Sequence, residues 1–173
     1  NNHYQEAAMR DRMTGLKNFG TFNTDLQQLY QRFQRNGQSF WLLELDIDPF
    51  NHINDTYGHL VGNTVLQTVA KATPPYAQTL TYDTAVYRMG GEEFCLLLRD
   101  GTDDVQAATQ IAAALRACLA ALQFYGEDGT PFAITVSIGA EHADADDQHY
   151  LDIYNRVDQF LYAVKRSGRD ALN

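Results

Sequence analysis

Cysteine and proline are scarce in this chain. Its 173 residues include only 2 cysteines and 4 prolines. Cys95 and Cys118 each lie within an apolar segment, and no metal-ligand spacing links the two. A disulfide-stapled secreted scaffold is therefore excluded, and we expect both cysteines to be reduced residues of a hydrophobic core.

Long hydrophobic runs are missing as well. A membrane-spanning helix needs roughly 20 consecutive apolar residues, and no stretch of the sequence approaches that length. There is no signal peptide, and the chain begins with Asn1 rather than methionine. We therefore expect a cytoplasmic domain excised from a longer protein, in which an upstream region senses a signal or anchors the protein to a membrane.

Positive charge is in deficit. The chain carries 13 lysines and arginines against 22 aspartates and glutamates, which gives a formal net charge of −9. Nucleic-acid binding depends largely on neutralising phosphates with cationic side chains, so we expect no nucleic acid among the partners. A small phosphorylated ligand is still compatible with this charge, because a local pair of cations and a metal ion suffice for one nucleotide.

Enough apolar sequence is present to build one folded domain, since hydrophobic residues make up 45% of the chain. Apolar periodicity and stop signals predict helices at residues 21–35, 51–55, 61–72, 105–122 and 150–167. Strands are predicted at residues 40–47, 85–98 (a hairpin) and 132–140. Pro74-Pro75 is expected to end the third helix. This order predicts an α/β (α+β) fold, with helices around a mainly antiparallel sheet of about five strands.

Two acidic segments stand at the ends of predicted strands. Gly90-Gly91-Glu92-Glu93 forms the turn of the predicted hairpin, and Asp46-Ile47-Asp48 ends the first strand. Adjacent glycines tolerate the positive φ angles of tight hairpin turns. Carboxylates that converge from two strand ends are typical of two-metal phosphoryl-transfer sites. A plain polar turn is the alternative interpretation of the two glutamates.

The order of several motifs resembles that of the GGDEF-domain diguanylate cyclases. The similar segments are residues 11–18, 46–59, 90–94, 137–139 and 158–169. The resemblance implies a nucleotidyl-cyclase-like fold, with residues 1–13 as the end of an incoming linker helix and residues 14–173 as a single catalytic domain. It also implies condensation of two GTP molecules into cyclic di-GMP, with loss of two pyrophosphates. A homodimer in which each protomer holds one GTP would carry out this reaction.

The same resemblance assigns roles in metal binding and catalysis. Asp46 and Glu92 would bind Mg²⁺, or Mn²⁺, through their side chains, and Ile47 would bind it through its carbonyl oxygen. Glu93 would be a further ligand or a base for the 3′-hydroxyl group.

Substrate contacts follow from the resemblance too. Asn54 and Asn63 would meet the guanine edge, Phe50 would line the substrate site, and Lys165 and Arg169 would hold the β- and γ-phosphates. Read without the family, Asn54 is a helix-cap or turn residue, and the two cations are partners of a helix dipole.

Three departures from the family pattern bear on activity. Asn63 replaces the usual aspartate, and an amide offers one acceptor and one donor where a carboxylate offers acceptors only. Asn51 replaces a lysine, and Pro49 has no backbone N–H to lend to a phosphate. Residues 81–84 also lack the Arg-x-x-Asp motif of the inhibitory product site. The sequence therefore leaves two alternatives beside the cyclase: a related enzyme with relaxed base preference, and a degenerate domain that binds a nucleotide or a partner protein without catalysis.

Overall fold

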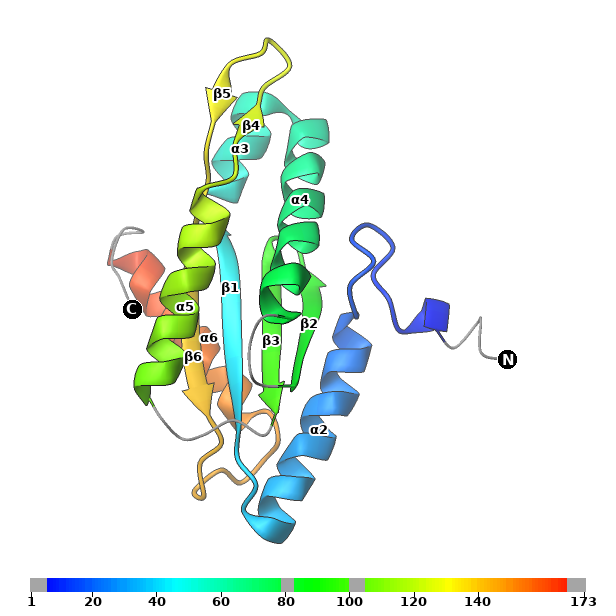
Figure 1. The fold of residues 1–173 in the computed structure, drawn as a ribbon, viewed down its shortest axis with the longest axis vertical. Coiled ribbons are helices and arrows are strands. Elements are labelled where there is room, and N and C mark those ends of the chain that lie inside the picture. The colour runs from blue at the N-terminus through cyan, green and yellow to red at the C-terminus, as the bar shows by residue number, and fades with distance from the viewer. Residues whose placement is uncertain (1–5, 79–82, 100–104, 168–173) are drawn as a thin grey trace.

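A four-stranded antiparallel sheet forms the centre of the computed structural model, which describes residues 6–78, 83–99 and 105–167 (Figure 1). The strands are β1 (Phe40–Asp48), β2 (Asp83–Gly90), β3 (Glu93–Arg99) and β6 (Thr135–His142), in the spatial order β2-β3-β1-β6. The predicted α+β class and antiparallel sheet are confirmed. Two further short strands, β4 (Phe124–Tyr125) and β5 (Pro131–Phe132), pair with each other in a separate hairpin.

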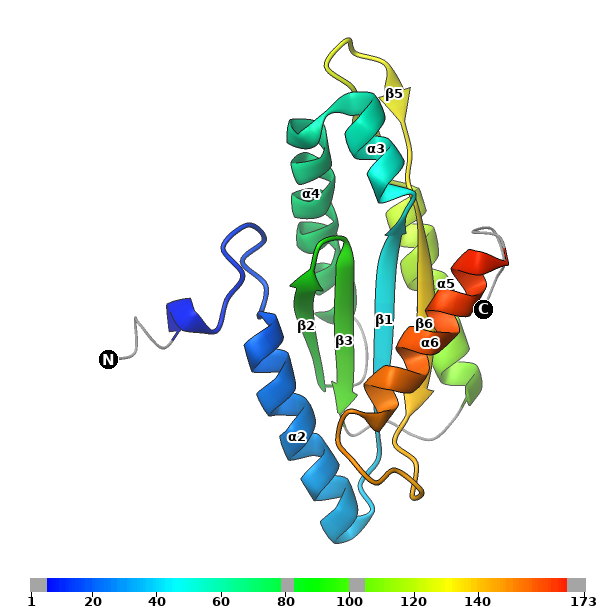
Figure 2. The same cartoon turned by 180° about the vertical axis from the view of Figure 1, so that it is seen from behind.

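Helices cover both faces of the sheet. The helices α3 (Phe50–Tyr57), α4 (His59–Gln78) and α5 (Val105–Ala120) pack on one face, and α2 (Phe19–Asn36) and α6 (Asp152–Arg166) pack on the other (Figures 1 and 2). Successive strand residues point to opposite faces. As a result β1 is buried along nearly its whole length, with Leu43 and Leu45 facing α4 and α5 and Leu42 facing α2 and α6.

Local sequence signals determine where α2 begins and ends. Asn18 caps its first turn by accepting a hydrogen bond from the backbone N–H of Thr21 at 3.0 Å. Gly37 ends the helix with a φ of 73°, a conformation that glycine adopts without steric cost. The helix expected at residues 21–35 is therefore confirmed, with ends two residues earlier and one residue later.

The expectation that Pro74-Pro75 ends the following helix is wrong, because α4 continues to Gln78. Each proline removes one backbone donor, but the packing of the last turn compensates for that loss. Ala77 is buried, and the Tyr76 hydroxyl donates to the carbonyl oxygen of Ile111 on α5 at 3.2 Å. Tertiary packing therefore outweighs the local stop signal.

The strand expected at residues 132–140 begins later than predicted, at Thr135. Phe132 belongs instead to the β4–β5 hairpin, where its ring stacks on Tyr57 of α3 with centroids 4.2 Å apart. Cys118 also departs from expectation, since it is exposed on α5 and only Cys95 lies in the core. Among the described residues, no helix combines the length and apolar character that a membrane crossing requires.

Candidate active site

The two acidic segments converge at one end of the central sheet. Asp46 of β1 and Glu93 of β3 are direct partners in the antiparallel register. The backbone N–H of Ile47 donates to the carbonyl oxygen of Glu92 at 3.3 Å, which ties the end of β1 to the hairpin turn. Gly90 and Gly91 have φ angles of 140° and 52°, so the turn uses the conformations that only glycine adopts readily. Asp46, Ile47, Glu92 and Glu93 are thus brought together.

Asp46 has one paired and one unpaired carboxylate oxygen. Lys165 of α6 donates from Nζ to Oδ2 at 2.6 Å. Oδ1 is buried and has no hydrogen-bond partner within the described parts of the chain. Burial raises the pKa of this carboxyl group to about 6, although Lys165 opposes the rise. A half-satisfied, partly desolvated carboxylate fits a hard divalent cation, because all-oxygen donor sets suit Mg²⁺ and Mn²⁺.

Glu93 is oriented by a residue that the sequence did not point to. The hydroxyl group of Tyr154 on α6 donates to its Oε1 at 2.5 Å. The Tyr154 ring also packs edge-on against Phe22 of α2, with centroids 5.8 Å apart. The carboxylate raises the pKa of the Tyr154 hydroxyl, and so does burial, which is the larger cause. The hydroxyl therefore stays protonated and remains a donor to Glu93.

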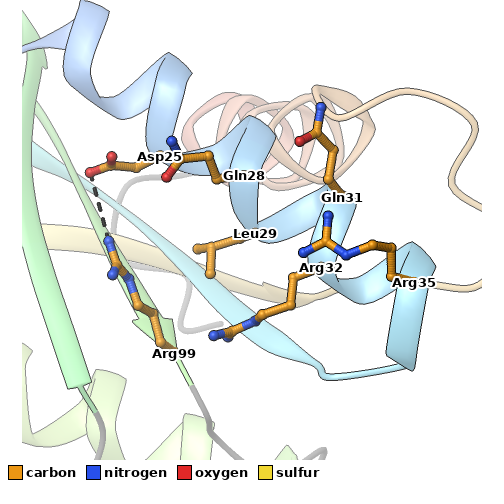
Figure 3. Close-up of a pocket in the computed structure, with 7 residues that line it drawn as sticks. All are labelled: Asp25, Gln28, Leu29, Gln31, Arg32, Arg35 and Arg99. Carbon is orange, nitrogen blue, oxygen red and sulfur yellow. Dashed lines mark ion pairs between the residues drawn. The ribbon is translucent and has the colours of Figure 1, made fainter.

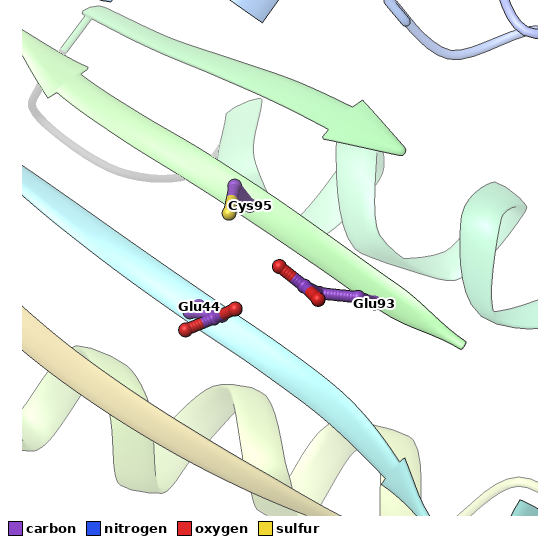
Figure 4. Close-up of side chains that lie close together, drawn as sticks. All are labelled: Glu44, Glu93 and Cys95. Atoms are coloured by element: carbon purple, nitrogen blue, oxygen red, sulfur yellow. The ribbon is translucent and has the colours of Figure 1, made fainter. Parts of the chain in front are cut away.

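Glu44 lies behind these residues on the same face of β1 as Asp46. It is fully buried and faces Glu93 and Cys95 of β3 (Figure 4). Loss of solvent, the larger cause, and the neighbouring Glu93 carboxyl group together raise its pKa to about 11. Because side chains alternate between the two faces of a strand, the sequence of β1 alone indicates that Glu44 shares a face with Asp46. The cover that α6 provides could not be read from the sequence.

Arg88 braces the hairpin turn from the neighbouring strand. Its guanidinium group donates to the carbonyl oxygen of Gly91 at 2.9 Å and to both carboxylate oxygens of Asp11 at 3.2 Å. Burial opposes ionisation of Asp11, but hydrogen bonds from Thr14 and Arg88 outweigh it and hold the pKa of that carboxyl group below its usual value. The N-terminal turn at residues 11–18 therefore supports the acidic hairpin.

A second group of predicted site residues lies where α3 meets α4. The Asn54 side chain packs over Gly62, and a Cβ at that position would collide with its Oδ1. Phe50 is buried beneath, and Asn63 is half-buried on the next position of α4. Gly62 therefore permits the close approach of the Asn54 side chain to α4, next to the position of Asn63.

The structure describes only some of the residues that were predicted to contact the phosphates. Lys165 is half-buried on the last turn of α6 and contacts Asp46, while Arg169 lies outside the described residues. Pro49 occupies the N-cap of α3 and supplies no side-chain cap. Asn51 is exposed on the first turn of that helix. The N-terminus of α3 therefore has one backbone donor fewer than a non-proline residue would give it.

A basic hollow of about 320 Å³ lies elsewhere, between α2 and the end of β3 (Figure 3). Its charged lining residues are Asp25, Arg32, Arg35 and Arg99. Asp25 pairs with Arg99 at 3.8 Å and accepts a hydrogen bond from the Tyr87 hydroxyl at 2.6 Å. This hollow shares no residue with the acidic cluster, so it does not belong to the candidate active site.

Comparisons with known proteins agree with this geometry. Residues 8–171 match the family model described as diguanylate cyclase, GGDEF domain. The chain is 36% identical over 168 residues to diguanylate cyclase DgcP of Pseudomonas aeruginosa, covering 97% of this chain and 24% of that protein. The chain therefore spans about a quarter of the length of this relative.

Solved structures show the same fold. The diguanylate cyclase SiaD of Pseudomonas aeruginosa, solved with its activator SiaC, has a TM-score of 0.84 at 34% identity, covering 96% of this chain and 61% of that one. The active GGEEF domain of a diguanylate cyclase from Vibrio cholerae has a TM-score of 0.71 at 32% identity, over 84% and 88% of the two chains. The family model matches nearly the whole chain, and the matched range includes the acidic hairpin. This chain belongs to the GGDEF domain family of diguanylate cyclases.

Proposed function

We propose that this domain is itself a diguanylate cyclase that condenses two GTP molecules into cyclic di-GMP. In each of two steps the 3′-oxygen of one nucleotide bonds to the α-phosphorus of the other, and the bond from that phosphorus to pyrophosphate breaks. The observation that carries the proposal is the pairing of Asp46 with Glu93, beside Glu92, at the end of the sheet. Fold alone would not support an activity, but these carboxylates supply the required chemistry.

Mg²⁺ or Mn²⁺, when bound, would neutralise phosphate charge and lower the pKa of the attacking hydroxyl group. Asp46 and Glu92 would hold it through their side chains, and Ile47 through its carbonyl oxygen. Glu93 would be a further ligand or would accept the 3′-hydroxyl proton. The Tyr154 hydroxyl holds the Glu93 carboxylate in position for either role.

The remaining predicted residues would bind the nucleotide. The amide groups of Asn54 and Asn63 would meet the base, and Phe50, whose ring lies near Gly62, would line the site. Lys165 and Arg169 would contact the terminal phosphates. Lys165 contacts Asp46 in the structure, so we infer that it turns from the carboxylate to the phosphates when a metal ion and nucleotide bind.

A homodimer is part of the proposal because one protomer offers one nucleotide site. The 3′-hydroxyl of each GTP must reach the α-phosphate of the other, so two sites must face each other. We place the reaction in the cytoplasm, where GTP is available. We expect sensory or membrane-anchoring regions of a longer protein to control the pairing of the two copies.

A non-catalytic nucleotide-binding or protein-binding domain is the second candidate. The specific observation in its favour is the start of α3, where Pro49 has no backbone donor and Asn51 carries no positive charge. Each lost contact to a phosphate would cost on the order of 1–3 kcal/mol of binding free energy. The carboxylates of the hairpin are unaffected by these changes, which is why we favour the enzyme.

Pyrophosphate release as a function of protein concentration separates the two candidates. A dimeric cyclase should release pyrophosphate from GTP with a specific activity that rises with protein concentration until dimerisation is complete. Asp46→Asn should abolish release while the protein stays folded. A folded sample that binds GTP but releases no pyrophosphate at any concentration would establish the binding domain instead.

A further inference from the structure

A cluster that contains sulfur lies next to the proposed magnesium ligands. Glu44, Glu93 and Cys95 each contribute one ligand atom, a carboxylate oxygen or Sγ, and these atoms all lie within 4.8 Å of one another (Figure 4). Glu44 and Cys95 are register partners across β1 and β3. Glu93 is the next residue on the same face of β3, toward the hairpin turn. All three therefore stand on rigid strands of the central sheet.

Glu44 is a buried carboxyl group that no cation among the described residues compensates. It is 0% exposed, no cationic side chain in the described parts of the chain pairs with it, and the group placed to share a hydrogen bond with it is another carboxyl group, that of Glu93. The charged groups that act most strongly on it are Glu93, Asp158 and Asp46, and all three are acidic. Lys165 is engaged with Asp46. A buried acid among other acids is costly unless a proton or a cation joins it.

We propose that Glu44, Glu93 and Cys95 bind a divalent cation with affinity for sulfur, of the Zn²⁺ class. One thiolate and two carboxylates supply three of the four ligands of a tetrahedral zinc site and leave one position for water. The thiolate argues against Mg²⁺ or Ca²⁺, which prefer sites made of oxygen alone. Coordination transfers the Cys95 thiol proton, and any proton on Glu44, to solvent.

The distances permit such a site after small side-chain rotations. Ligand atoms around a tetrahedral zinc ion are roughly 3.5 Å apart, while those of the cluster are separated by up to 4.8 Å. Both glutamates have three side-chain torsions with which to close this difference, and Cys95 is fixed on its strand. Glu93 is half-buried, so it offers the route by which an ion enters from the hairpin side.

Glu93 belongs both to this cluster and to the proposed catalytic set. The consequence for activity rests on the proposed function: an ion held by Glu44 and Cys95 would draw Glu93 away from the reaction, so Zn²⁺ should inhibit cyclic di-GMP formation. The binding itself does not depend on catalysis and can be measured separately.

The test is a Co²⁺ titration of the purified domain in the presence of excess Mg²⁺. Bound Co²⁺ reports a thiolate ligand through a charge-transfer band in the near ultraviolet. We expect this band in the wild-type protein and in Cys118→Ser, whose altered thiol is exposed on α5. It should vanish in Cys95→Ser and in Cys95→Ala, and Glu44→Gln should weaken Co²⁺ binding at least tenfold.

Zn²⁺ should displace Co²⁺ and bleach the band. Circular dichroism and thermal unfolding establish that each variant is folded. The proposal is overturned if the wild-type protein shows no thiolate band, if the band persists without Cys95, or if it requires Cys118. A wild-type protein without the band would mean that only a proton joins Glu44 and Glu93, and that result leaves the proposed cyclase activity untouched.

Discussion

The ammonium group of Lys165 donates to Oδ2 of Asp46 at 2.6 Å, across 119 positions of the sequence. This contact joins the last turn of α6 to the end of β1. It links a residue proposed to bind phosphate to a residue proposed to bind metal. The charge state of the acidic site therefore depends on α6, which lies near the C-terminal end of the sequence.

The Lys165–Asp46 pair predicts an acid limit for metal binding. The pKa of Asp46 is about 6, so the carboxyl group is ionised at neutral pH and becomes protonated as the pH falls through that value. Mg²⁺ binding, measured by calorimetry, should therefore weaken below about pH 6. The Lys165 ammonium group favours the ionised form of Asp46. Lys165→Gln removes that cation, so it should raise the pKa of Asp46 and with it the acid limit by roughly one pH unit. Arg166→Gln, on the exposed neighbour, should leave it unchanged, and equal limits in all three proteins would contradict the account.

Replacing Tyr154 with phenylalanine should slow catalysis without weakening substrate binding. The change removes the hydroxyl that donates to Glu93 Oε1. Hydrogen bonds to charged groups contribute about 1.5–3 kcal/mol, so kcat should fall about tenfold or more while the KM for GTP stays nearly constant. Tyr162→Phe changes an exposed tyrosine of the same helix and serves as control. A rise in KM alone would assign Tyr154 to substrate binding.

Glu44 predicts an unusual pH dependence of stability. Its pKa rises from 4.5 in the ordinary state to about 11 in the fold, so the native state keeps a proton that the unfolded chain releases. The free energy of unfolding should therefore decrease as the pH rises between these values.

Glutamine at position 44 has no proton to lose. Glu44→Gln should flatten the pH profile and be the more stable protein at pH 8 by roughly 1–3 kcal/mol. Glu127→Gln, in the exposed β4–β5 turn, controls for the loss of one carboxylate. Denaturant unfolding at pH 5, 7 and 9 gives the comparison. Parallel profiles for the wild type and Glu44→Gln would show that Glu44 ionises normally.

Gly62→Ala should separate nucleotide binding from stability. The new methyl group would displace the end of the Asn54 side chain from its place over α4, and the KM for GTP should rise about tenfold with the loss of its hydrogen bond. Alanine is a better helix former than glycine by about 1 kcal/mol, so thermal stability should not fall. Thr64→Ala, on the exposed side of the same helix, should bind normally. An unchanged KM in Gly62→Ala would remove Asn54 from the base site.

Base selectivity offers a direct test of Asn63. A carboxylate at this position accepts from both donors of the guanine edge, whereas the amide satisfies only one of them. Asn63→Asp should therefore increase the preference for GTP over ATP in competition binding by about tenfold. Gln67→Glu adds the same charge to the exposed side of α4 and should not change the preference. A wild-type protein that already prefers GTP by several orders of magnitude would refute the idea of relaxed selectivity.

Local signals in the sequence were sufficient for the parts of the site that lie on turns and strand ends. Two adjacent glycines between apolar runs predict the hairpin, and an acidic strand end predicts where Asp46 meets it. The same reasoning failed at Pro74-Pro75, where packing of Tyr76 and Ala77 sustains the helix. Where a helix ends is decided there by contacts between elements that are far apart in the sequence.

The residues that support the acidic cluster from behind could not be predicted from the sequence either. Tyr154 reaches Glu93 across 61 positions, and the alternation of β1 gives the face of Glu44 but not the helix that buries it. Arg88 pairs with Asp11 across 77 positions of the sequence. Residue types and periodicity indicate which groups are available, and tertiary structure decides which of them meet.

Identification of the product made from GTP tests directly whether this domain is a diguanylate cyclase. Purified protein would be incubated with Mg²⁺ and GTP, and the products separated by chromatography and identified by mass spectrometry. We expect cyclic di-GMP from the wild-type protein and none from the Glu92→Ala/Glu93→Ala double variant. Failure to form any cyclic dinucleotide, in a folded and concentrated sample that binds GTP, would contradict this expectation.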